Sequence, residues 1–390
     1  MCSLLAAIGK LLTSGDRDER EDAVRSEAST ADRRPRILIT LRDGGENGGP
    51  YVSHQRIMES DLKDTYEFIP LMVPRARVLM RPAGMKSFVK SIKSARPDIV
   101  HYAGLQLEGY LVSTAIGLAG VKRSVLAVHG SSREAVYFAT YKRLVVSVLE
   151  AITLRRASMC YTVSDYAAGW DTIRHNSRNF FGRIYNLPSQ SMASHEVGGV
   201  RRELGISSDD TVVVSTGRVT AEKGFDVLLE ALKLVDCSTR FKALIVGEGD
   251  YLETMKAGVR ASGLGGDVIF LGYRADVYRI LAESDIFVLC SLHETLSNSI
   301  IEAGQHALPV VATDVGGVPE IVRDGYNGFL VDPGSAGDVA RALERLIGDP
   351  DLRRTMGQNA YLNIQDRFGT EETLGQLGTL YRELLDAARD

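Results

Sequence analysis

Residues 285–322 read DIFVLCSLHETLSNSIIEAGQHALPVVATDVGGVPEIV, and this stretch decides the fold. Two short apolar runs, 285–290 and 308–313, flank a segment whose apolar residues have helical spacing. Continuous runs of Val, Ile and Leu separated by helices are typical of parallel strands that are buried on both faces. The stretch therefore predicts a strand–helix–strand unit of a parallel sheet.

The same alternation extends through both halves of the chain. The first half has apolar runs at 36–41, 98–103, 124–129, 159–164 and 183–186, and the second half has them at 211–217, 241–247, 267–272, 285–290, 308–313 and 328–332. Repeated strand–helix units imply doubly wound sheets, in which ligands bind beyond the carboxyl ends of the strands. We expect an α/β architecture of two Rossmann-like lobes that face a central cleft.

Length and composition place the domain boundaries. At 390 residues the chain is long for one domain. Residues 1–34 are mostly charged and poor in apolar groups, which predicts a disordered N-terminal extension. The polar stretch 186–199 is the natural linker. We expect one Rossmann-like domain at 35–190, a second at 191–368, and a C-terminal helix at 369–390.

Cysteine usage and hydropathy indicate a cytoplasmic protein. The cysteines are far apart and show no CxxC spacing, which fits a reducing compartment and argues against a disulfide or zinc framework; they are Cys2, Cys160, Cys237 and Cys290. No apolar run reaches the roughly 20 residues that span a bilayer. The opening MCSLLAAIGKLL is short and lacks the leading positive charge of a signal peptide.

Charge is distributed unevenly between the two halves. Residues 33–190 contain 23 Lys and Arg against 12 Asp and Glu, whereas residues 191–390 contain 19 against 31. A basic first lobe is expected to face something anionic. No helix-turn-helix, zinc-finger or RNP pattern supports nucleic acid. The basic clusters at 74–82, 86–97, 141–144 and 154–157 fit peripheral contact with an anionic membrane, or equally a solvated helix face.

Two cations follow the strand predicted at 211–217. Arg218 and Lys223 lie between this strand and an amphipathic helix, and Gly224 follows the lysine. Arginine makes bidentate bonds to phosphate oxygens and lysine supplies a point charge, so the pair suits a diphosphate. The alternative for such an isolated pair is a surface salt-bridge cluster with Glu222.

Two carboxylates bracket the helix start in the opening stretch. Glu294 lies in the loop, Ser297 or Asn298 is the expected N-cap, and Glu302 lies inside the helix. Free backbone N–H groups at the helix start can hold phosphate. One carboxylate can then accept hydrogen bonds from a sugar and the other from a ribose diol. A paired-carboxylate glycosidase fits poorly, because the pocket between the two groups is of the phosphate type.

The first lobe offers weaker signals. Gly44, Gly45, Gly48 and Gly49 follow the first strand without forming the GxGxxG dinucleotide fingerprint. A glycine-rich turn there admits close approach of a ligand, although many such turns are only flexible loops. His129 ends the strand at 124–129, where a substrate contact and a structural hydrogen bond are both plausible roles.

In these residues the chain resembles a known family, the retaining GT-B glycosyltransferases of the group 1 type. The second lobe carries the motifs GR, EKG, LIVGEGD, VIFLGY, the E-x7-E pair and LPVVATDVGGVPEIV. The first lobe matches more loosely, through GGENGG, PDIVHYAG, AVHG and VSDYAAGW. The resemblance implies a first lobe that binds the acceptor, a second lobe that binds a nucleotide-diphosphate sugar, and a C-terminal helix that crosses back to the first lobe.

The resemblance also assigns roles to single residues. Arg218 and Lys223 match the diphosphate-binding pair, Glu294 matches the glutamate that contacts the sugar, and Glu302 matches the one that holds the ribose. Further matches are the phosphate-cradling amides of Leu296 and Ser297, the sugar-contacting His129, the glycine loop at Gly48 and Gly49, and the base-bordering Gly272 and Tyr273.

Thr295 departs from the family pattern, which commonly has glycine after the first glutamate. Since glycine adopts backbone angles that threonine resists, the phosphate loop is open to a change of shape. The expected activity is hexosyl transfer with retention in the biosynthesis of a polysaccharide, glycolipid or other glycoconjugate. We expect no metal, because no D-x-D pair sits at a strand end. A GT-B nucleotide-sugar epimerase and a non-catalytic nucleotide-sugar-binding protein are the alternatives.

Overall fold

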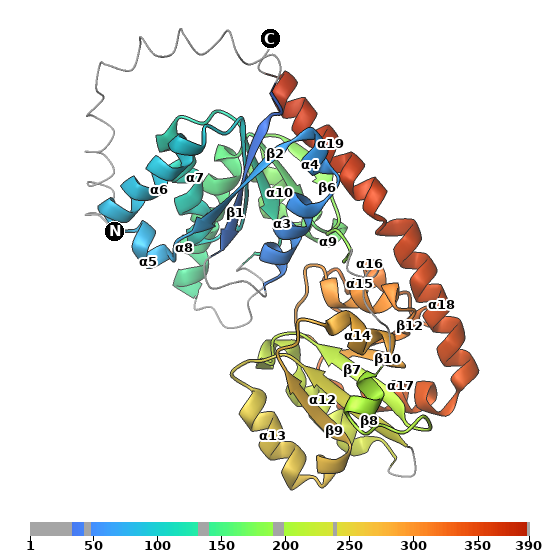
Figure 1. Ribbon diagram of the computed structural model, residues 1–390. Coiled ribbons are helices and arrows are strands. Elements are labelled where there is room, and N and C mark those ends of the chain that lie inside the picture. Colours follow the sequence, from blue (N-terminus) through green and yellow to red (C-terminus); the bar gives the residue numbers. More distant parts are fainter. Residues whose placement is uncertain (1–32, 43–47, 132–139, 190–198, 237–239, 388–390) are drawn as a thin grey trace, which may run out of the picture.

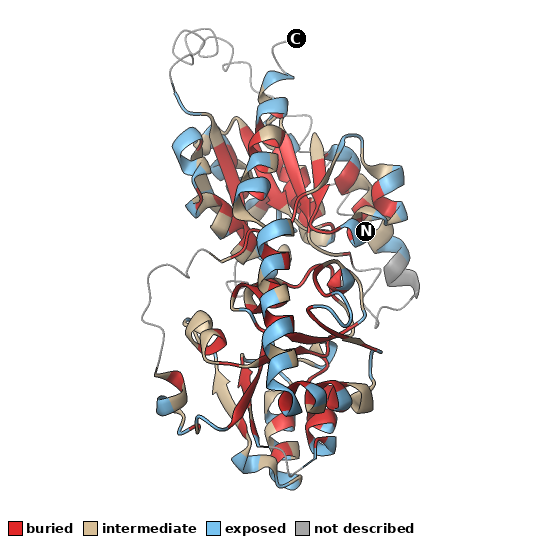
Figure 2. Cartoon of the chain, turned by 90° about the vertical axis from the view of Figure 1, so that its right-hand side faces the viewer, coloured by how far each residue is buried: buried red, intermediate tan, exposed pale blue. Residues whose placement is uncertain are grey.

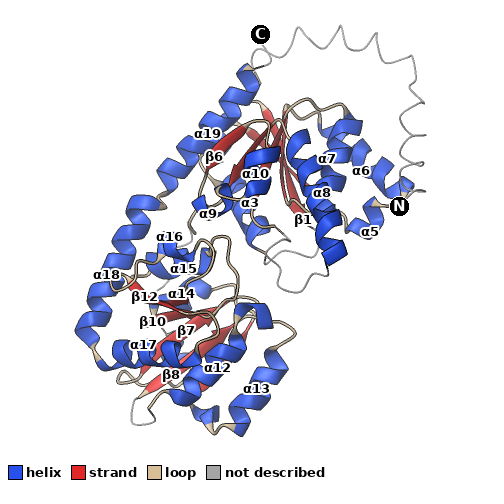
Figure 3. Cartoon of the chain, turned by 180° about the vertical axis from the view of Figure 1, so that it is seen from behind, coloured by secondary structure: helices blue, strands red, loops and turns tan. Residues whose placement is uncertain are grey.

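The computed structural model describes residues 33–42, 48–131, 140–189, 199–236 and 240–387. Within these ranges the chain forms two lobes, each built on a six-stranded parallel sheet with helices on its faces (Figures 1 and 3). The expected two-lobed α/β architecture is thus confirmed. The predicted disordered extension falls almost wholly on residues outside the described ranges, as do Gly44 and Gly45.

The first sheet has the order β2-β1-β3-β4-β5-β6. Its strands are β1 (Arg36–Arg42), β2 (Glu67–Val73), β3 (Ile99–Ala103), β4 (Ser124–Val128), β5 (Met159–Thr162) and β6 (Phe180–Arg183). The helices of this lobe are α3 (Gly49–Glu59), α4 (Leu62–Thr65), α5 (Ala76–Leu79), α6 (Pro82–Ala95), α7 (Leu107–Ala119), α8 (Thr140–Arg156), α9 (Asp165–Ala168) and α10 (Asp171–Asn176).

The second sheet has the order β12-β11-β10-β7-β8-β9. Its strands are β7 (Thr211–Thr216), β8 (Phe241–Val246), β9 (Val268–Gly272), β10 (Ile286–Leu289), β11 (Val310–Thr313) and β12 (Gly328–Val331). The helical segments are α11 (Val200–Glu203), η5 (Ala221–Lys223), α12 (Phe225–Leu234), α13 (Leu252–Ala261), η6 (Leu264–Gly266), α14 (Val277–Ala282), α15 (Asn298–Gln305), α16 (Val318–Ile321) and α17 (Ala336–Gly348).

The apolar runs predicted the interior strands well, and the two differences lie toward the edges of the first sheet. Strand β2 was not predicted: it is an edge strand, and it contains Pro70, which cannot donate a ladder hydrogen bond and is tolerated only at an edge. The run predicted at 183–186 was wrong in position, because β6 at the opposite edge is Phe180–Arg183 and residues 184–187 follow it as buried chain.

Two consecutive helices connect the lobes on one side of the molecule. Helix α18 (Pro350–Arg367) packs on the second lobe, and α19 (Thr370–Asp386) continues onto the first (Figure 2). The Tyr381 hydroxyl lies 2.7 Å from Nδ1 of His101 in the core of the first lobe, and the Tyr66 ring packs edge-on against the Tyr381 ring. The C-terminal helix therefore crosses back to the first lobe, as expected.

Helix α19 shares one hydrophobic cluster with both lobes. The cluster joins Ile37 and Ile99 of the first sheet with Phe287 of the second, and Leu377 and Leu380 of α19 belong to it. Within the part of the chain that the structure describes, no helix combines the length and hydropathy needed to span a bilayer.

Candidate functional site

The loop after β7 is pressed against the end of β10. Gly224 has a left-handed backbone with φ of 66°, and a Cβ atom on it would lie 1.9 Å from the carbonyl oxygen of Cys290. Only glycine meets both conditions without a shift of the backbone. This close approach places Lys223, the residue before Gly224, beside the loop that carries Glu294.

Lys223 and Glu294 form an ion pair at this point. The lysine Nζ lies 2.6 Å from Oε1 of Glu294, and the Ser291 hydroxyl donates to the same oxygen at 2.8 Å. The glutamate side chain is only 9% exposed. Two site residues that are 71 positions apart in the sequence are thus brought together.

Two glycines of the segment after β11 hold the backbone of Glu294 in place. A Cβ atom on Gly316 would lie 1.8 Å from the Glu294 carbonyl oxygen, and Gly316 itself has a φ of 55°. The amide of Gly317 donates to that same oxygen at 3.0 Å. The sequence VGGVPE therefore acts as a support for the glutamate loop.

The N-terminus of α15 follows Glu294 directly. Ser297 is its N-cap, and the serine hydroxyl accepts a hydrogen bond from the Ile300 amide, in agreement with the sequence. Leu296 is buried, so that it is the backbone of this turn, and not the leucine side chain, that is available to a ligand. Unpaired amides and the helix dipole make such a terminus favourable for an anion.

A second helix N-terminus, from the first lobe, meets the first one. Gly48 is the N-cap of α3 and offers no side-chain cap. A Cβ atom on Gly49 would lie 3.8 Å from Nδ2 of Asn298, the first residue of α15. Two positive dipole ends therefore converge on the boundary between the lobes, and this arrangement is suited to a group with several negative charges, such as a diphosphate.

Thr295 faces the first lobe beside His129. A Cβ atom on Gly130 would lie 3.6 Å from Oγ1 of Thr295. Among the described non-glycine residues, positive φ angles occur at Arg96 and Ala307 and not at Thr295. Threonine is therefore accommodated here without the left-handed backbone that would require glycine.

His129 is half-buried and lies beside two buried histidines, His54 and His101. Burial lowers the pKa of His129 to about 3, and the nearby His54 adds to the effect. The two rings are 6.0 Å apart, and Nε2 of His129 has no hydrogen-bond partner among the described residues. The His129 imidazole is therefore neutral at physiological pH and can act through a hydrogen bond.

The remaining predicted residues lie around this centre. Arg218 is exposed, just after β7, and its side chain has no hydrogen-bond partner in the described part of the chain. Gly272 ends β9 with a φ of 62°, and its carbonyl accepts from the Gly247 amide at 2.8 Å. Tyr273 beside it is 56% exposed, so its ring is free to cover a flat ligand.

Glu302 has a partner that was not predicted. Nη2 of Arg56, in α3 of the first lobe, donates to Oε1 of Glu302. The Glu302 side chain is 21% exposed and paired, so it does not lie on a solvated helix face. The two residues are separated by 246 positions, and nothing in the local pattern of either helix signals the pair.

Glu320 is a second residue that was not singled out. Its carboxylate accepts from the amides of Asp165 and Tyr166 at 3.0 and 2.8 Å and from the Tyr185 hydroxyl at 3.0 Å. Glu320 thus caps helix α9 of the first lobe from the second lobe. The signal available in the sequence was its place in the VGGVPE segment.

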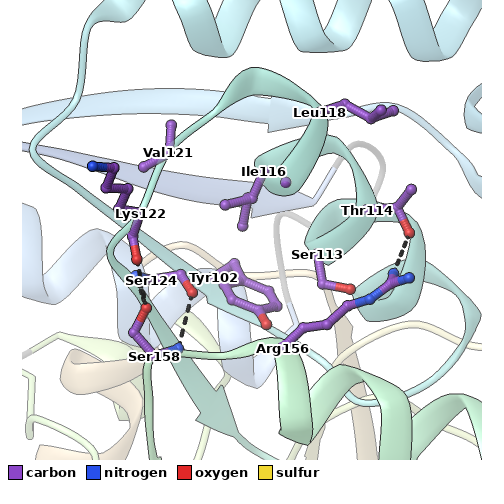
Figure 4. A pocket seen from close by; sticks show the side chains of 11 residues that line it. Tyr102, Ser113, Thr114, Ile116, Leu118, Val121, Lys122, Ser124, Arg156 and Ser158 are labelled. Carbon is purple, nitrogen blue, oxygen red and sulfur yellow. Dashed lines mark hydrogen bonds between the residues drawn. The ribbon is translucent and has the colours of Figure 1, made fainter. Parts of the chain in front are cut away.

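A separate cavity of about 300 Å³ lies away from this site (Figure 4). It opens at the amino end of the first sheet, where Ser124 begins β4 and Ser158 precedes β5. Arg156 spans one side and donates to Thr114 Oγ1 at 2.7 Å. Because ligands of open α/β sheets bind at the carboxyl ends of the strands, this cavity is not part of the candidate site.

The second lobe matches a known protein family. Residues 199–363 match the family model of group 1 glycosyl transferases. This range contains every second-lobe residue described above, from Arg218 to Glu320. The two lobes share the GT-B fold of solved glycosyltransferases.

Two of the relatives with assigned names are described as glycosyltransferases. A lipopolysaccharide core biosynthesis glycosyltransferase of Rhizobium meliloti is 33% identical over 44% of this chain and 49% of its own length. A capsular polysaccharide biosynthesis glycosyltransferase of Staphylococcus aureus is 23% identical over 84% of this chain and 90% of its own. The chain spans about half the length of the first curated relatives it matches.

Solved structures match both lobes together. Anabaena HepE, solved in complex with UDP and glucose, superposes with a TM-score of 0.75 over 90% of this chain and 100% of its own, at 22% identity. WaaG, a glycosyltransferase involved in lipopolysaccharide biosynthesis, superposes with a TM-score of 0.69 over 88% and 99%, at 17% identity. At these identities the likeness establishes the fold.

Proposed function

We propose that the chain is a group 1 glycosyltransferase that moves a hexosyl group from a nucleotide-diphosphate sugar to an acceptor. The observation that carries the proposal is the Lys223–Glu294 pair at the N-terminus of α15, where a second helix N-terminus also converges. Cations and helix ends would bind the diphosphate, and acceptor groups would bind the sugar. The family match of the second lobe and the names of the relatives support this assignment.

The reaction requires stabilisation of the charge that develops on the leaving phosphate. Arg218, Lys223 and the α15 amides would supply this stabilisation already oriented. Glu294 would exchange its bond with Lys223 for hydroxyls of the sugar, and the neutral His129 would hydrogen-bond the sugar from the first lobe. Glu302 would hold the ribose, and Tyr273 would border the base.

We propose retention of the anomeric configuration through a same-face displacement. The bond from the anomeric carbon to the phosphate oxygen breaks, and the acceptor oxygen bonds to that carbon on the same face. The acceptor proton passes to an oxygen of the leaving phosphate. We propose a metal-independent step, because no D-x-D pair follows a strand and Arg218, Lys223 and the α15 amides would bind the diphosphate. The names of the lipopolysaccharide and capsular polysaccharide relatives favour an acceptor in glycoconjugate biosynthesis.

The test is nucleotide release from UDP-, GDP-, dTDP- and ADP-sugars with EDTA present, followed by the anomeric proton couplings of the product. Release from one donor, abolished in Glu294→Gln, is expected, and the donor that reacts names the base and the sugar. Release that requires Mg²⁺ would contradict metal independence. Epimerised free sugar would favour the epimerase. Tight donor binding without release, with acceptor extracts added, would favour a non-catalytic protein.

We further propose that the first lobe contacts an anionic membrane. Seven cations between Pro74 and Pro97 are all exposed, and this segment contains no acidic residue; they are Arg75, Arg77, Arg81, Lys86, Lys90, Lys93 and Arg96. Val78 and Met80 among them are 39% and 43% exposed. Each cation near an anionic surface contributes about 1 kcal/mol, and exposed apolar groups can enter the interface.

Vesicle flotation tests the membrane contact. Binding to phosphatidylglycerol vesicles and not to phosphatidylcholine vesicles is expected, with loss in the triple variant Lys86→Glu, Lys90→Glu, Lys93→Glu. The matched control is Arg341→Glu with Arg354→Glu, which reverses exposed charges of the second lobe. Equal loss in both variants, or binding to neutral vesicles, would contradict the proposal.

A further inference from the structure

Arg56 joins the first lobe to the residue that faces the ribose in the proposed function. Its Nη2 donates to Oε1 of Glu302, and its Nη1 donates to the carbonyl of Leu187 at 2.9 Å. The arginine and glutamate side chains are 14% and 21% exposed, so the pair is largely shielded from water. An arginine held at both nitrogens has a fixed orientation, and it fixes the carboxylate it contacts.

Three further hydrogen bonds join α3, α15 and the connecting chain near the Arg56–Glu302 pair, where the chain leaves the first lobe. Ser53 of α3 donates to Oδ1 of Asn186 at 2.9 Å, and Nδ2 of Asn186 donates to Asn298 of α15 at 2.8 Å. Farther along, Gln305 of α15 donates to the carbonyl of Ser189 at 3.1 Å. The connecting chain is therefore held between the two helices that carry Arg56 and Glu302.

The pairing leaves half of the Glu302 carboxylate available. Oε1 is taken by Arg56, while Oε2 has no hydrogen-bond partner in the part of the chain that the structure describes. A carboxylate oxygen with its lone pairs free accepts hydrogen bonds from adjacent hydroxyl groups. A vicinal diol, which is what a ribose presents, supplies two such donors.

We infer that Arg56 is a positioning residue for nucleotide recognition: it fixes Glu302 through one oxygen so that the other binds the ribose diol. The inference rests on the proposed function, in which Glu302 faces the donor nucleotide. It extends donor recognition to a residue of the first lobe, outside the residues 199–363 that match the family. Affinity for the ribose then depends on how α3 and α15 are joined.

The role of Arg56 is tested by the ratio between the affinity for a ribonucleotide and the affinity for its 2′,3′-dideoxy counterpart. Calorimetry compares UDP, GDP and ADP with their 2′,3′-dideoxy counterparts, and the pair used is the one whose ribonucleotide binds. Hydrogen bonds to a charged group contribute substantially to binding free energy. The unaltered protein is therefore expected to bind the ribonucleotide about tenfold or more tightly than the dideoxy compound. Glu302→Gln is expected to remove most of this preference. Arg56→Met is expected to lower it severalfold in the same direction, with little change for the dideoxy compound.

Two further variants separate positioning from structure. Arg56→Lys keeps the charge without the forked geometry and is expected to give an intermediate ratio. Arg354→Met removes an exposed surface pair and is the matched control, with an unchanged ratio. A purely structural role of Arg56 would weaken binding of both nucleotides equally.

The outcomes distinguish this inference from the function on which it rests. An unchanged ribose preference in both Arg56 variants, with Glu302→Gln still removing it, overturns the role of Arg56 alone. Tighter ribonucleotide binding in Arg56→Met also overturns it, since the pair would then block the diol. If the unaltered protein binds none of the nucleotides, the proposed function fails first.

Discussion

Lys223 and Glu294 hold each other in place at the carboxyl edge of the second sheet, with Nζ 2.6 Å from Oε1. Glu294 is almost fully buried, and its other contact at that oxygen is the Ser291 hydroxyl. The pair therefore links stability to activity. Removal of the lysine leaves a buried carboxylate with a single neutral donor, and it also removes a charge meant for the diphosphate.

Lys223→Ala is expected to lower the free energy of unfolding by about 1–3 kcal/mol and turnover by about 100-fold or more, with a much smaller change in donor binding. Urea unfolding, steady-state kinetics and calorimetry measure the three quantities. The matched control is Lys233→Ala, whose pair with Glu230 has the same 2.6 Å separation but lies on the surface. Unchanged turnover in Lys223→Ala would remove Lys223 from the mechanism.

Gly224→Ala is expected to destabilise the protein by more than backbone conformation alone explains. Gly205 has nearly the same φ, 67° against 66°, yet nothing lies within 4 Å of a Cβ atom placed on it. Gly205→Ala should cost about 1–2 kcal/mol for the left-handed backbone, and Gly224→Ala about 1–3 kcal/mol more for the clash with Cys290. Equal unfolding free energies for the two variants would show that the loop relaxes freely.

Tyr381→Phe is expected to lower the free energy of unfolding by about 1–3 kcal/mol, because a nitrogen of the buried His101 loses its partner. Tyr361→Phe in α18 is the control, since no hydrogen bond of its hydroxyl is found within the described structure. A change below about 0.5 kcal/mol is expected there. If both variants lose the same free energy of unfolding, the hydrogen bond between Tyr381 and His101 makes no net contribution to stability.

Stability is expected to fall as the pH drops from 6.5 toward 4. Burial lowers the pKa of His54 to about 4, against a partly offsetting hydrogen bond to the Thr40 carbonyl. Below pH 6.5 the unfolded chain takes up a proton that the folded chain does not, so folding loses about 2 kcal/mol between pH 7 and pH 5 from this histidine. His54→Asn, which keeps a donor for Thr40, should flatten the urea-unfolding free energy over that range. If the unfolding free energies of His54→Asn and of the unaltered protein change with pH in parallel, the prediction is wrong.

The interior of the fold could be predicted from the sequence because its strands are buried on both faces. Strand β7, for example, is buried at every position and reads as TVVVST. Strand β2 was not predicted because it lies at the edge of the sheet and is not buried on both faces. Met72 is exposed, the neighbouring Val73 is buried, and Pro70 interrupts the apolar run. Edge strands obey weaker compositional rules than central ones.

The second-lobe site could likewise be predicted where its residues follow strands that are recognisable in the sequence. Lys223 and Glu294 stand in short loops after apolar strands, and such loops converge in any parallel sheet. Arg56 could not be found in this way, since it is one polar residue of an ordinary helix and its partner is 246 positions away. The histidine group escaped for the same reason: His54, His101 and His129 come from three separate elements.

The crossing of α19 has a consequence for the order in which the protein is made. Strand β6 completes the first sheet at Arg183, but the partner of His101 Nδ1 is Tyr381, about 200 residues later. At the ribosome's rate of about 5–20 residues per second, roughly 10–40 s pass between the synthesis of β6 and the synthesis of Tyr381. During this time Nδ1 of His101 lacks its partner and the surface under α19 is uncovered, while the second lobe is synthesised. The lobe that is synthesised first is therefore the one that is finished last.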